Sequence, residues 1–188
     1  MESLSSIYEA VKSRASDLVG YMGSEHEVAR LAKYLNRSEF SVLLRIYREL
    51  PVCGMLMAFA IDSNGNPSPP VAQSECDYDS ARDHEFTWMS PNHVIEELEQ
   101  ALAGSAAFAA GFVPLGMCSS GGDGYFLRIM TEGKAPVRLF QVYYDWYDPT
   151  KGVLVIPEAV HLVCQSFDQA VRVAHFGAGI PRLEAPLD

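Results

Sequence analysis

The sequence predicts an α+β fold, in which N-terminal helices and two further helices pack around a mainly antiparallel, twisted sheet of about five or six strands. Three observations predict it. Apolar residues recur at helical spacing through the first fifty residues, later apolar segments are short and strand-like, and short turns join most of those segments. Helices followed by turn-connected strands are typical of the α+β class.

Three helices are expected in the first fifty residues. The first presents an apolar face and ends at Gly20 or Gly23, because glycine readily terminates helices. The second begins with Ser24 and Glu27, which are spaced to form a capping box. The third covers about residues 39–50 and stops before a proline.

The segment at residues 55–61 is continuous and apolar, which predicts a central strand buried on both faces. It leads into residues 62–85, a long connection with three prolines and no periodicity. This acidic insert holds six carboxylates against one base, Arg82. Two interpretations stay open, an interaction surface and a solvated, mobile loop.

A short strand at residues 86–88 then leads into a helix. Ser90 is its expected cap, Pro91 occupies its first position, and its apolar spacing continues to Leu102. Further strands are expected at residues 112–117, 125–130, 137–144 and 153–156. The segment at 125–130 alternates with period two, as a half-buried strand does.

A final helix opens at Ser166 with Gln169 in the capping-box position, and it ends by Gly177. The sequence holds no internal repeats. The whole chain, residues 1–188, is therefore expected to form a single domain with a helical N-terminal part at 1–50 and the insert at 62–85.

Composition favours a folded protein and does not by itself identify a partner. Hydrophobic residues make up 48% and charged residues 20%, which excludes a disordered chain. The chain has 14 Lys and Arg against 24 Asp and Glu, a net charge of −10. This charge repels nucleic acid and anionic membranes, and two interpretations stay open: it steers a basic partner to the protein, or it simply keeps the protein in solution.

No metal or cofactor is expected. The four cysteines contain no C-x-x-C pair, and the five histidines show no close ligand spacing. The N-terminus has no basic stretch leading into an apolar one, so we expect a cytoplasmic protein with reduced thiols. The 22 uncharged residues at 101–122 are not a membrane helix, because Pro114 and several glycines interrupt them.

Residues 118–127 read CSSGGDGYFL, and kinases that phosphorylate lipids or nicotinamide dinucleotides carry a similar GGDG. A phosphate site of that kind requires the glycines to open a helix, whose N–H groups meet the anion. Here an alternating strand follows. We therefore expect Gly121, Gly122 and Asp123 to form a structural corner before a strand that begins near Tyr125.

Five segments resemble the SUKH superfamily, named for relatives of a fungal cell-wall-synthesis regulator. They are Phe112-Val113-Pro114-Leu115, Gly122-Asp123, Tyr125-Phe126-Leu127, Tyr144-Asp145 and Ser166-Phe167. Upstream, residues 86–90 resemble the strand and helix start of these families. The resemblance covers about residues 50–175 and rests on the order and spacing of the segments. Many bacterial members are immunity proteins, which bind and block a cognate toxin, often one that acts on nucleic acid.

The resemblance implies a non-enzymatic protein that blocks a basic, nucleic-acid-acting toxin. We expect carboxylates to steer the encounter and aromatic anchors to supply affinity. Candidate partner-binding residues are Glu75, Asp77, Tyr78, Asp79, Asp83, Glu85, Asp145, Trp146, Tyr147 and Asp148. Candidate structural residues are Trp88, Pro114, Gly121, Gly122, Asp123, Tyr125, Ser166 and Phe167.

Two other functions compete with this one. Residues 24–50 have the spacing of a DNA-binding helix-turn-helix, with Arg37, Arg45 and Arg48 available to phosphates. Two packed amphipathic helices give the same spacing, and the acidic chain opposes DNA binding. An enzyme has no support, because no catalytic set is evident and His161 and Cys164 are expected to be core residues.

Overall fold

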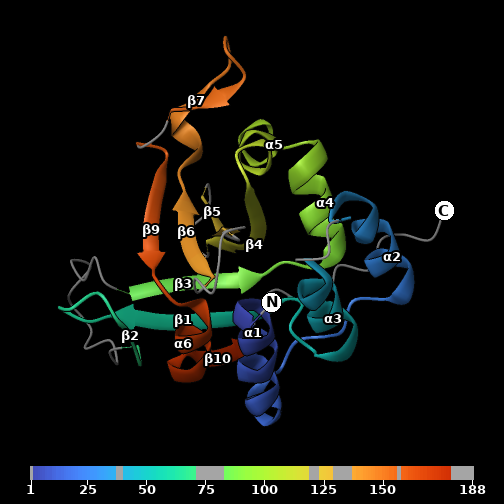
Figure 1. Cartoon of the computed structure of the whole chain (residues 1–188), viewed down its shortest axis with the longest axis vertical. Coiled ribbons are helices and arrows are strands. Elements are labelled where there is room, and N and C mark those ends of the chain that lie inside the picture. The colour runs from blue at the N-terminus through green and yellow to red at the C-terminus, as the bar shows by residue number, and fades with distance from the viewer. Residues whose placement is uncertain are drawn as a thin grey trace.

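The computed structural model describes residues 2–36, 40–70, 83–118, 123–128, 137–155 and 158–178. Its helices are α1 (Glu2–Ser13), α2 (Glu25–Tyr34), α3 (Ser41–Glu49), α4 (Pro91–Glu99), α5 (Leu102–Ala109) and α6 (Phe167–Val173). Its strands are β1 (Met55–Ile61), β2 (Pro67–Ser68), β3 (Asp83–Trp88), β4 (Phe112–Cys118), β5 (Gly124–Arg128), β6 (Arg138–Val142), β7 (Tyr147–Asp148), β8 (Val153–Leu154), β9 (Val160–Cys164) and β10 (His175–Ala178). Figure 1 shows their arrangement.

The strands form one curled antiparallel sheet in the order β10-β1-β3-β4-β5-β6-β9, with β2 paired to the end of β1. Strands β7 and β8 pair separately. The α+β class is confirmed, although the eight-stranded main sheet has more strands than the five or six expected. Strand β9 was not predicted and β10 was assigned to the final helix, because short edge strands lack clear alternation.

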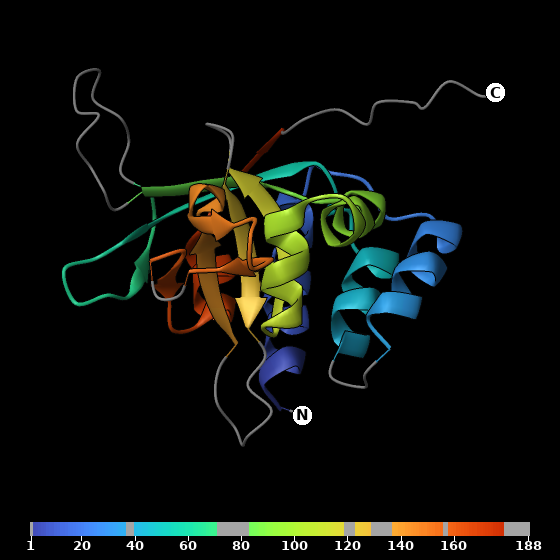
Figure 2. The same cartoon turned by 90° about the horizontal axis from the view of Figure 1, so that it is seen from above.

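The N-terminal helices begin largely as expected. In the capping box of α2, the Ser24 hydroxyl accepts the Glu27 N–H and the Glu27 carboxylate accepts the Ser24 N–H, at 3.2 and 2.8 Å. The first helix is shorter than predicted and ends at Ser13, followed by a 3₁₀ turn at Ala15–Asp17. Figures 1 and 2 place α2 and α3 together at one end of the molecule and the β1–β2 turn at the other.

The predicted helix through Leu102 is wrong, because the chain breaks into α4 and α5. Ala101 adopts an extended conformation before α5, and Leu102 is 64% exposed. The start of α4 is as expected, with Pro91 in the first turn and the Ser90 hydroxyl accepting the His93 N–H. The break lets α5 cover a different face of the sheet from the other helices.

The last helix also differs from its prediction. Ser166 makes no capping hydrogen bond to the helix backbone, and its hydroxyl donates to the Asp168 carboxylate at 2.5 Å. Helix α6 ends at Val173, since residues 175–178 pair with β1. The expected capping box at Gln169 is therefore absent.

Both faces of strands β4, β5 and β6 are buried, against two separate cores. Tyr125 and Leu127 face a large core shared with α1, α2, α3, α4 and α6. Phe126 faces a small core under α5 and β8. The prediction of a half-buried strand at 125–130 is wrong for this reason. Within the described residues, no helix is long and apolar enough to cross a membrane.

The N-terminal and C-terminal helices lie side by side (Figure 1) and are joined by one arginine. The Arg14 guanidinium donates to the carbonyls of Val171, Arg172 and Ala174 at 3.3, 2.8 and 3.0 Å. It also lies 4.9 Å from the centre of the Phe176 ring. A cation at the C-terminal end of α6 satisfies carbonyls that the helix leaves open.

Candidate protein-binding surface

A projecting two-stranded ribbon, residues 143–155, carries most of the predicted partner-binding residues that the structure describes. It begins with a 3₁₀ turn at Tyr144–Trp146 and continues into the β7–β8 pair. Figure 1 shows the ribbon at the top of the molecule, away from α1 and α6. The ribbon thus lies on the opposite side of the molecule from these two helices.

Asp148 shapes the turn of the ribbon. Its Oδ1 accepts from the N–H and hydroxyl of Thr150 and from the Lys151 N–H, at 2.9, 2.6 and 3.2 Å. The Lys151 ammonium lies 3.1 Å from Oδ2. These donors lower the pKa of Asp148 to about 2. Gly152, with φ of +66°, completes the turn, so Asp148 has a structural role in the ribbon.

The outer face of the ribbon exposes large apolar side chains. Trp146 is 50% exposed, Val153 46% and Val155 39%. The Val155 N–H donates to the Trp146 carbonyl at 2.9 Å, so these two residues lie across the ribbon from each other. Alternation turns Tyr147 and Leu154 inward, against the small core. The result is an apolar surface with a tryptophan at one side.

The base of the ribbon is held by a partly buried carboxyl on α4. The Tyr144 hydroxyl donates to Glu97. Burial raises the pKa of Glu97, and the hydrogen bond from Tyr144 opposes that rise. Gly104 on α5 leaves room for the pair, because a Cβ there would collide with the Glu97 side chain and carbonyl. Three separate elements therefore meet at the base of the ribbon.

The Asp123 corner is tied to the start of the ribbon. It opens strand β5, as expected, and Gly121 and Gly122 lie outside the described residues. The Asp123 carboxylate accepts the Tyr144 N–H and lies 3.5 Å from the Gln141 amide nitrogen. Burial, aided by the charge of Asp145, raises the pKa of Asp123. The aspartate thus interacts with strand β6 and with the start of the ribbon.

The other predicted partner-binding residues lie either outside the described part of the chain or on strand β3. Glu75, Asp77, Tyr78 and Asp79 lie outside the described residues. Asp83 and Glu85 belong to β3, which is separated from β6 by two strands, and the Glu85 side chain is exposed. Among the candidates that the structure describes, it therefore brings together Asp145, Trp146, Tyr147 and Asp148. Residues 62–85 were predicted to be one long loop, but Pro67–Ser68 form strand β2 and strand β3 begins at Asp83.

The predicted structural residues mostly lie in the large core. Trp88, Tyr125 and Phe167 are each at most 2% exposed, and the Trp88 and Phe167 rings lie 5.9 Å apart. Pro114 is buried in β4 at a register shift, where the sheet tolerates a residue without an N–H.

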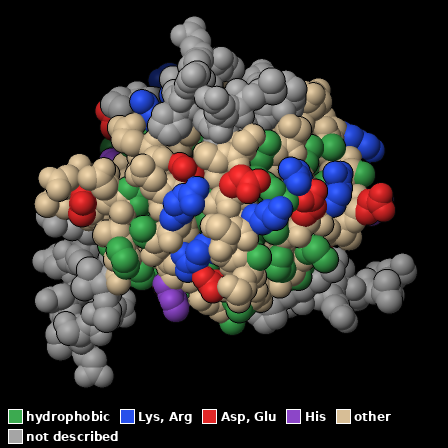
Figure 3. Space-filling view, turned by 60° about the horizontal axis from the view of Figure 1, so that its bottom comes forward, with side chains coloured by type: hydrophobic (Ala, Val, Ile, Leu, Met, Phe, Trp, Pro, Cys, Tyr) green, Lys and Arg blue, Asp and Glu red, His purple; other side chains and the backbone are tan. Residues whose placement is uncertain are grey.

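The residues proposed for DNA contact are partly engaged elsewhere. The Arg45 Nε donates to the Glu49 carboxylate at 2.9 Å, and the guanidinium lies 3.9 Å from the Tyr8 ring centre. Arg48 is exposed on α3, and Arg37 lies outside the described residues. Figure 3 shows that positive and negative side chains are interspersed on the face turned toward the bottom of Figure 1. A face of mixed sign is poorly suited to a phosphate backbone.

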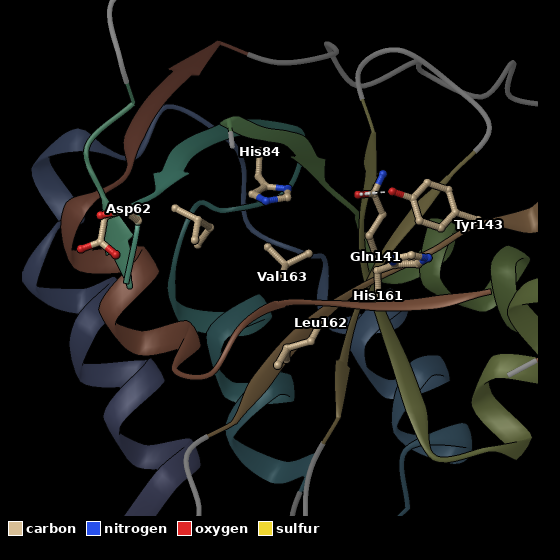
Figure 4. A pocket seen from close by; sticks show the side chains of 9 residues that line it. Asp62, His84, Gln141, Tyr143, His161, Leu162 and Val163 are labelled. Atoms are coloured by element: carbon tan, nitrogen blue, oxygen red, sulfur yellow. Dashed lines mark hydrogen bonds between the residues drawn. The ribbon is translucent and has the colours of Figure 1, made fainter. Parts of the chain in front are cut away.

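Sequence reasoning missed a polar pocket of about 370 Å³ between the two arms of the curled sheet. Its lining comes from the end of β1 and from β3, β6 and β9: Ile61, Asp62, Ser63, His84, Gln141, Tyr143, His161, Leu162 and Val163. Figure 4 shows Asp62 at one end, Tyr143, Gln141 and His161 at the other, and His84 between them. No sequence motif links these residues, because they are far apart in the chain and meet only through the curl of the sheet.

Of His161 and Cys164, which were both expected in the core, Cys164 is buried and His161 is not. His161 is exposed on β9, where its ring lies 4.8 Å from that of Tyr143. Cys164 is buried, and burial raises its pKa to about 12. The two residues pair with different positions of β6: His161 lies opposite the polar Gln141, whereas Cys164 lies opposite Leu139 in the large core.

Comparison with known proteins gives no match: no protein-family model, no curated protein and no solved structure is similar to this chain. Its function therefore has to be inferred from the ribbon, the corner and the pocket.

Proposed function

We propose that the protein is a non-enzymatic protein-binding domain whose ribbon inserts Trp146 into a basic partner protein. The proposal rests on Trp146, which is half exposed on a projecting ribbon. The base of this ribbon is held by the hydrogen bond from Tyr144 to Glu97. Tryptophan is enriched among the few residues that dominate protein interfaces. Its exposed neighbours Val153 and Val155 extend the apolar contact and exclude water around it.

Charge supports a basic partner. The chain carries a net charge of −10, and Asp145 is exposed next to Trp146. Asp148 is neutralised locally by Lys151 and held by its own turn, so it contributes little to recognition. The field of the whole chain speeds the encounter with a basic surface, while Trp146 slows dissociation.

The resemblance to SUKH proteins extends this proposal to an immunity protein. A toxin that acts on nucleic acid presents a basic cleft to the phosphate backbone. An acidic protein that covers this cleft blocks the toxin by occlusion, without any reaction of its own. DNA binding through residues 24–50 is a weaker candidate, because Arg45 is held by Glu49 and Tyr8.

The test compares Trp146→Ala with Met22→Ala, a control at an apolar residue that is 53% exposed and lies off the ribbon. The wild-type protein captures its partner from a lysate of its source cells, and calorimetry then measures the affinity of the purified partner. We expect Trp146→Ala to weaken binding by about 30-fold or more, the effect of losing a hot-spot residue. Met22→Ala should change the affinity by less than about twofold.

Three further results bear on the proposal. Higher salt should slow association with the partner. Equal affinity of the wild type and Trp146→Ala, or association that is independent of salt, would contradict it. Firm, salt-sensitive binding of a random DNA duplex would favour the helix-turn-helix alternative instead. For the immunity role, co-expression with the identified partner should restore the growth of cells that the partner poisons.

A further inference from the structure

We propose that Arg128 and Arg138 together bind a phosphate group, either the free ion or the phosphate of a small organic molecule. The two arginines are direct partners in the register of β5 and β6. Opposed residues of an antiparallel pair lie side by side on one face of the sheet, where like charges repel each other. A bound phosphate offsets this repulsion, because both guanidiniums attract it. The proposal goes beyond the protein-binding function and does not depend on it.

Both arginines lie on the face of the sheet that carries the small core. Residues two apart on a strand share a face, so Arg128 lies on the side of Phe126. Arg138 lies on the side of Phe140 for the same reason, and both phenylalanines belong to the small core. The Arg128 guanidinium lies 4.9 Å from the centre of the Phe112 ring, which is within the range of a cation–π contact. The small core thus holds this side chain in place beside its partner.

No carboxylate of the described residues neutralises the two arginines. Strands β4, β5, β6 and β9 and helix α5 contain neither aspartate nor glutamate. Within the described part of the chain, neither Arg128 nor Arg138 forms a salt bridge or donates a hydrogen bond. The Nε atom of Arg138 is buried and has no hydrogen-bond partner. Because a buried donor without an acceptor is costly, this atom points to a ligand that supplies an acceptor.

The chemistry of the two side chains favours a phosphate. Each guanidinium presents paired N–H donors that fit two oxygens of an oxyanion. Their two positive charges match a phosphate dianion better than the single charge of a carboxylate. Arg128 is exposed and Arg138 is half-buried, so a small ion reaches both. Salt screens charges that lie farther away than about 8 Å, so the adjacent guanidiniums outweigh the net charge of −10 at this position.

The test titrates the whole protein with inorganic phosphate and, separately, with phenyl phosphate and acetate, at an ionic strength held constant with sodium chloride. The NMR signals of the Arg128 and Arg138 Nε–H groups report binding at the site. The Nε–H groups of Arg14 and Arg45 donate to carboxylates and serve as internal controls. We expect phosphate to shift the two site signals in a saturable way, with a dissociation constant of about 1 mM or below. The control signals should stay in place.

Matched variants separate this site from other arginines. Arg138→Gln removes one charge and should weaken phosphate binding about tenfold. Arg48→Gln makes the same change at an exposed arginine on α3, which packs against the large core, and should leave the affinity within about twofold. Arg138→Lys keeps the charge without the paired donors, so its affinity should fall between these two. Arg128→Gln, at an exposed residue, gives the same comparison if urea unfolding shows that Arg138→Gln does not fold.

Equal phosphate affinity of the wild type, Arg128→Gln and Arg138→Gln would overturn the proposal. Equal affinity for acetate and phosphate would contradict it as well, since the second positive charge would then play no part. Shifts that do not saturate, or that appear equally at Arg14 and Arg45, would show general salt effects and refute the site. Tighter binding of phenyl phosphate than of inorganic phosphate would support the site with an organic phosphate as its ligand, and the reverse order would support it with the free ion.

Discussion

The two faces of the central strands differ in how they are covered. On one face, α1, α2, α3, α4 and α6 surround a large core that includes Trp88 and Phe167. On the other, α5 and β8 cover a small core built from three phenylalanines and several alanines. The large core is mainly apolar and includes the buried rings of Tyr47 and Trp88, whereas the smaller one ends at the Tyr144–Glu97 hydrogen bond.

The large core mainly stabilises the fold, whereas the small core mainly positions the candidate binding surface. Most of the buried apolar area lies in the large core, which therefore contributes most of the free energy of folding. The small core positions the ribbon, whose outer residues contribute little to folding and remain available for a partner. Substitutions on the two faces should consequently have effects of very different size.

The largest expected effect is in the large core. Phe167→Ala removes a fully buried ring that packs on Trp88, and we expect a loss of about 3–5 kcal/mol in the free energy of unfolding. Urea unfolding measures it as a lower midpoint with an unchanged slope. A loss below about 1 kcal/mol would show that α6 is not an integral part of the core.

Loss of the hydrogen bonds from Arg14 to the end of α6 should have an intermediate effect on the free energy of unfolding. Arg14→Met keeps much of the side-chain volume but removes the donors to three carbonyls after and within α6. We expect a loss of about 1–2 kcal/mol in thermal or urea unfolding. Arg30→Met, at an exposed arginine on α2, is the control and should cost less than about 0.5 kcal/mol. Equal effects of the two variants would contradict a special role for Arg14.

A smaller effect is expected at the base of the ribbon and depends on pH. Burial raises the pKa of Glu97, so the folded state binds this proton more tightly than the unfolded chain. The resulting stabilisation is fully present below the unfolded pKa and is lost as pH rises through the folded pKa. Glu97→Gln stays neutral and keeps an oxygen for the Tyr144 hydroxyl.

The free energy of unfolding of Glu97→Gln should therefore increase relative to that of the wild type as pH rises from about 4, which is below the ordinary pKa of glutamate. Urea unfolding at a series of pH values measures the difference. Parallel pH profiles for the two proteins would show that Glu97 ionises as an exposed carboxyl does.

The smallest effect on the free energy of unfolding is expected for a substitution of Trp146 on the ribbon. Because its side chain is half exposed on the ribbon, Trp146→Ala should change the free energy of unfolding by less than about 0.5 kcal/mol. Thermal unfolding checks this value. A loss of 2 kcal/mol or more, roughly the cost of opening a core cavity, would place Trp146 among the structural residues.

The sequence predicted elements whose signals are local. The Ser24–Glu27 capping box, the apolar strand β1 and the Ser90-Pro91 helix start all depend on neighbouring residues, and all three form. Strands β9 and β10 were missed because each is ordered mainly by its partner strand. Their short sequences carry no clear period of their own.

The candidate site was predictable only in part. Trp146 stood out as an aromatic residue in an acidic, aromatic segment, and the structure leaves it half exposed. The role of Asp148 in its turn and the contact of Tyr144 with Glu97 were not evident, because spacing does not reveal which carboxylate is already bonded. The pocket depends on distant strands that meet through the curl of the sheet.

Site-specific photo-crosslinking tests the central claim most directly. A benzophenone amino acid replaces Trp146 in one protein and Met22 in another, and both are irradiated in the source cells. The account predicts that the same basic protein is crosslinked at position 146 and not at position 22. Crosslinking of that protein at position 22 alone, or of nucleic acid at either position, would contradict it.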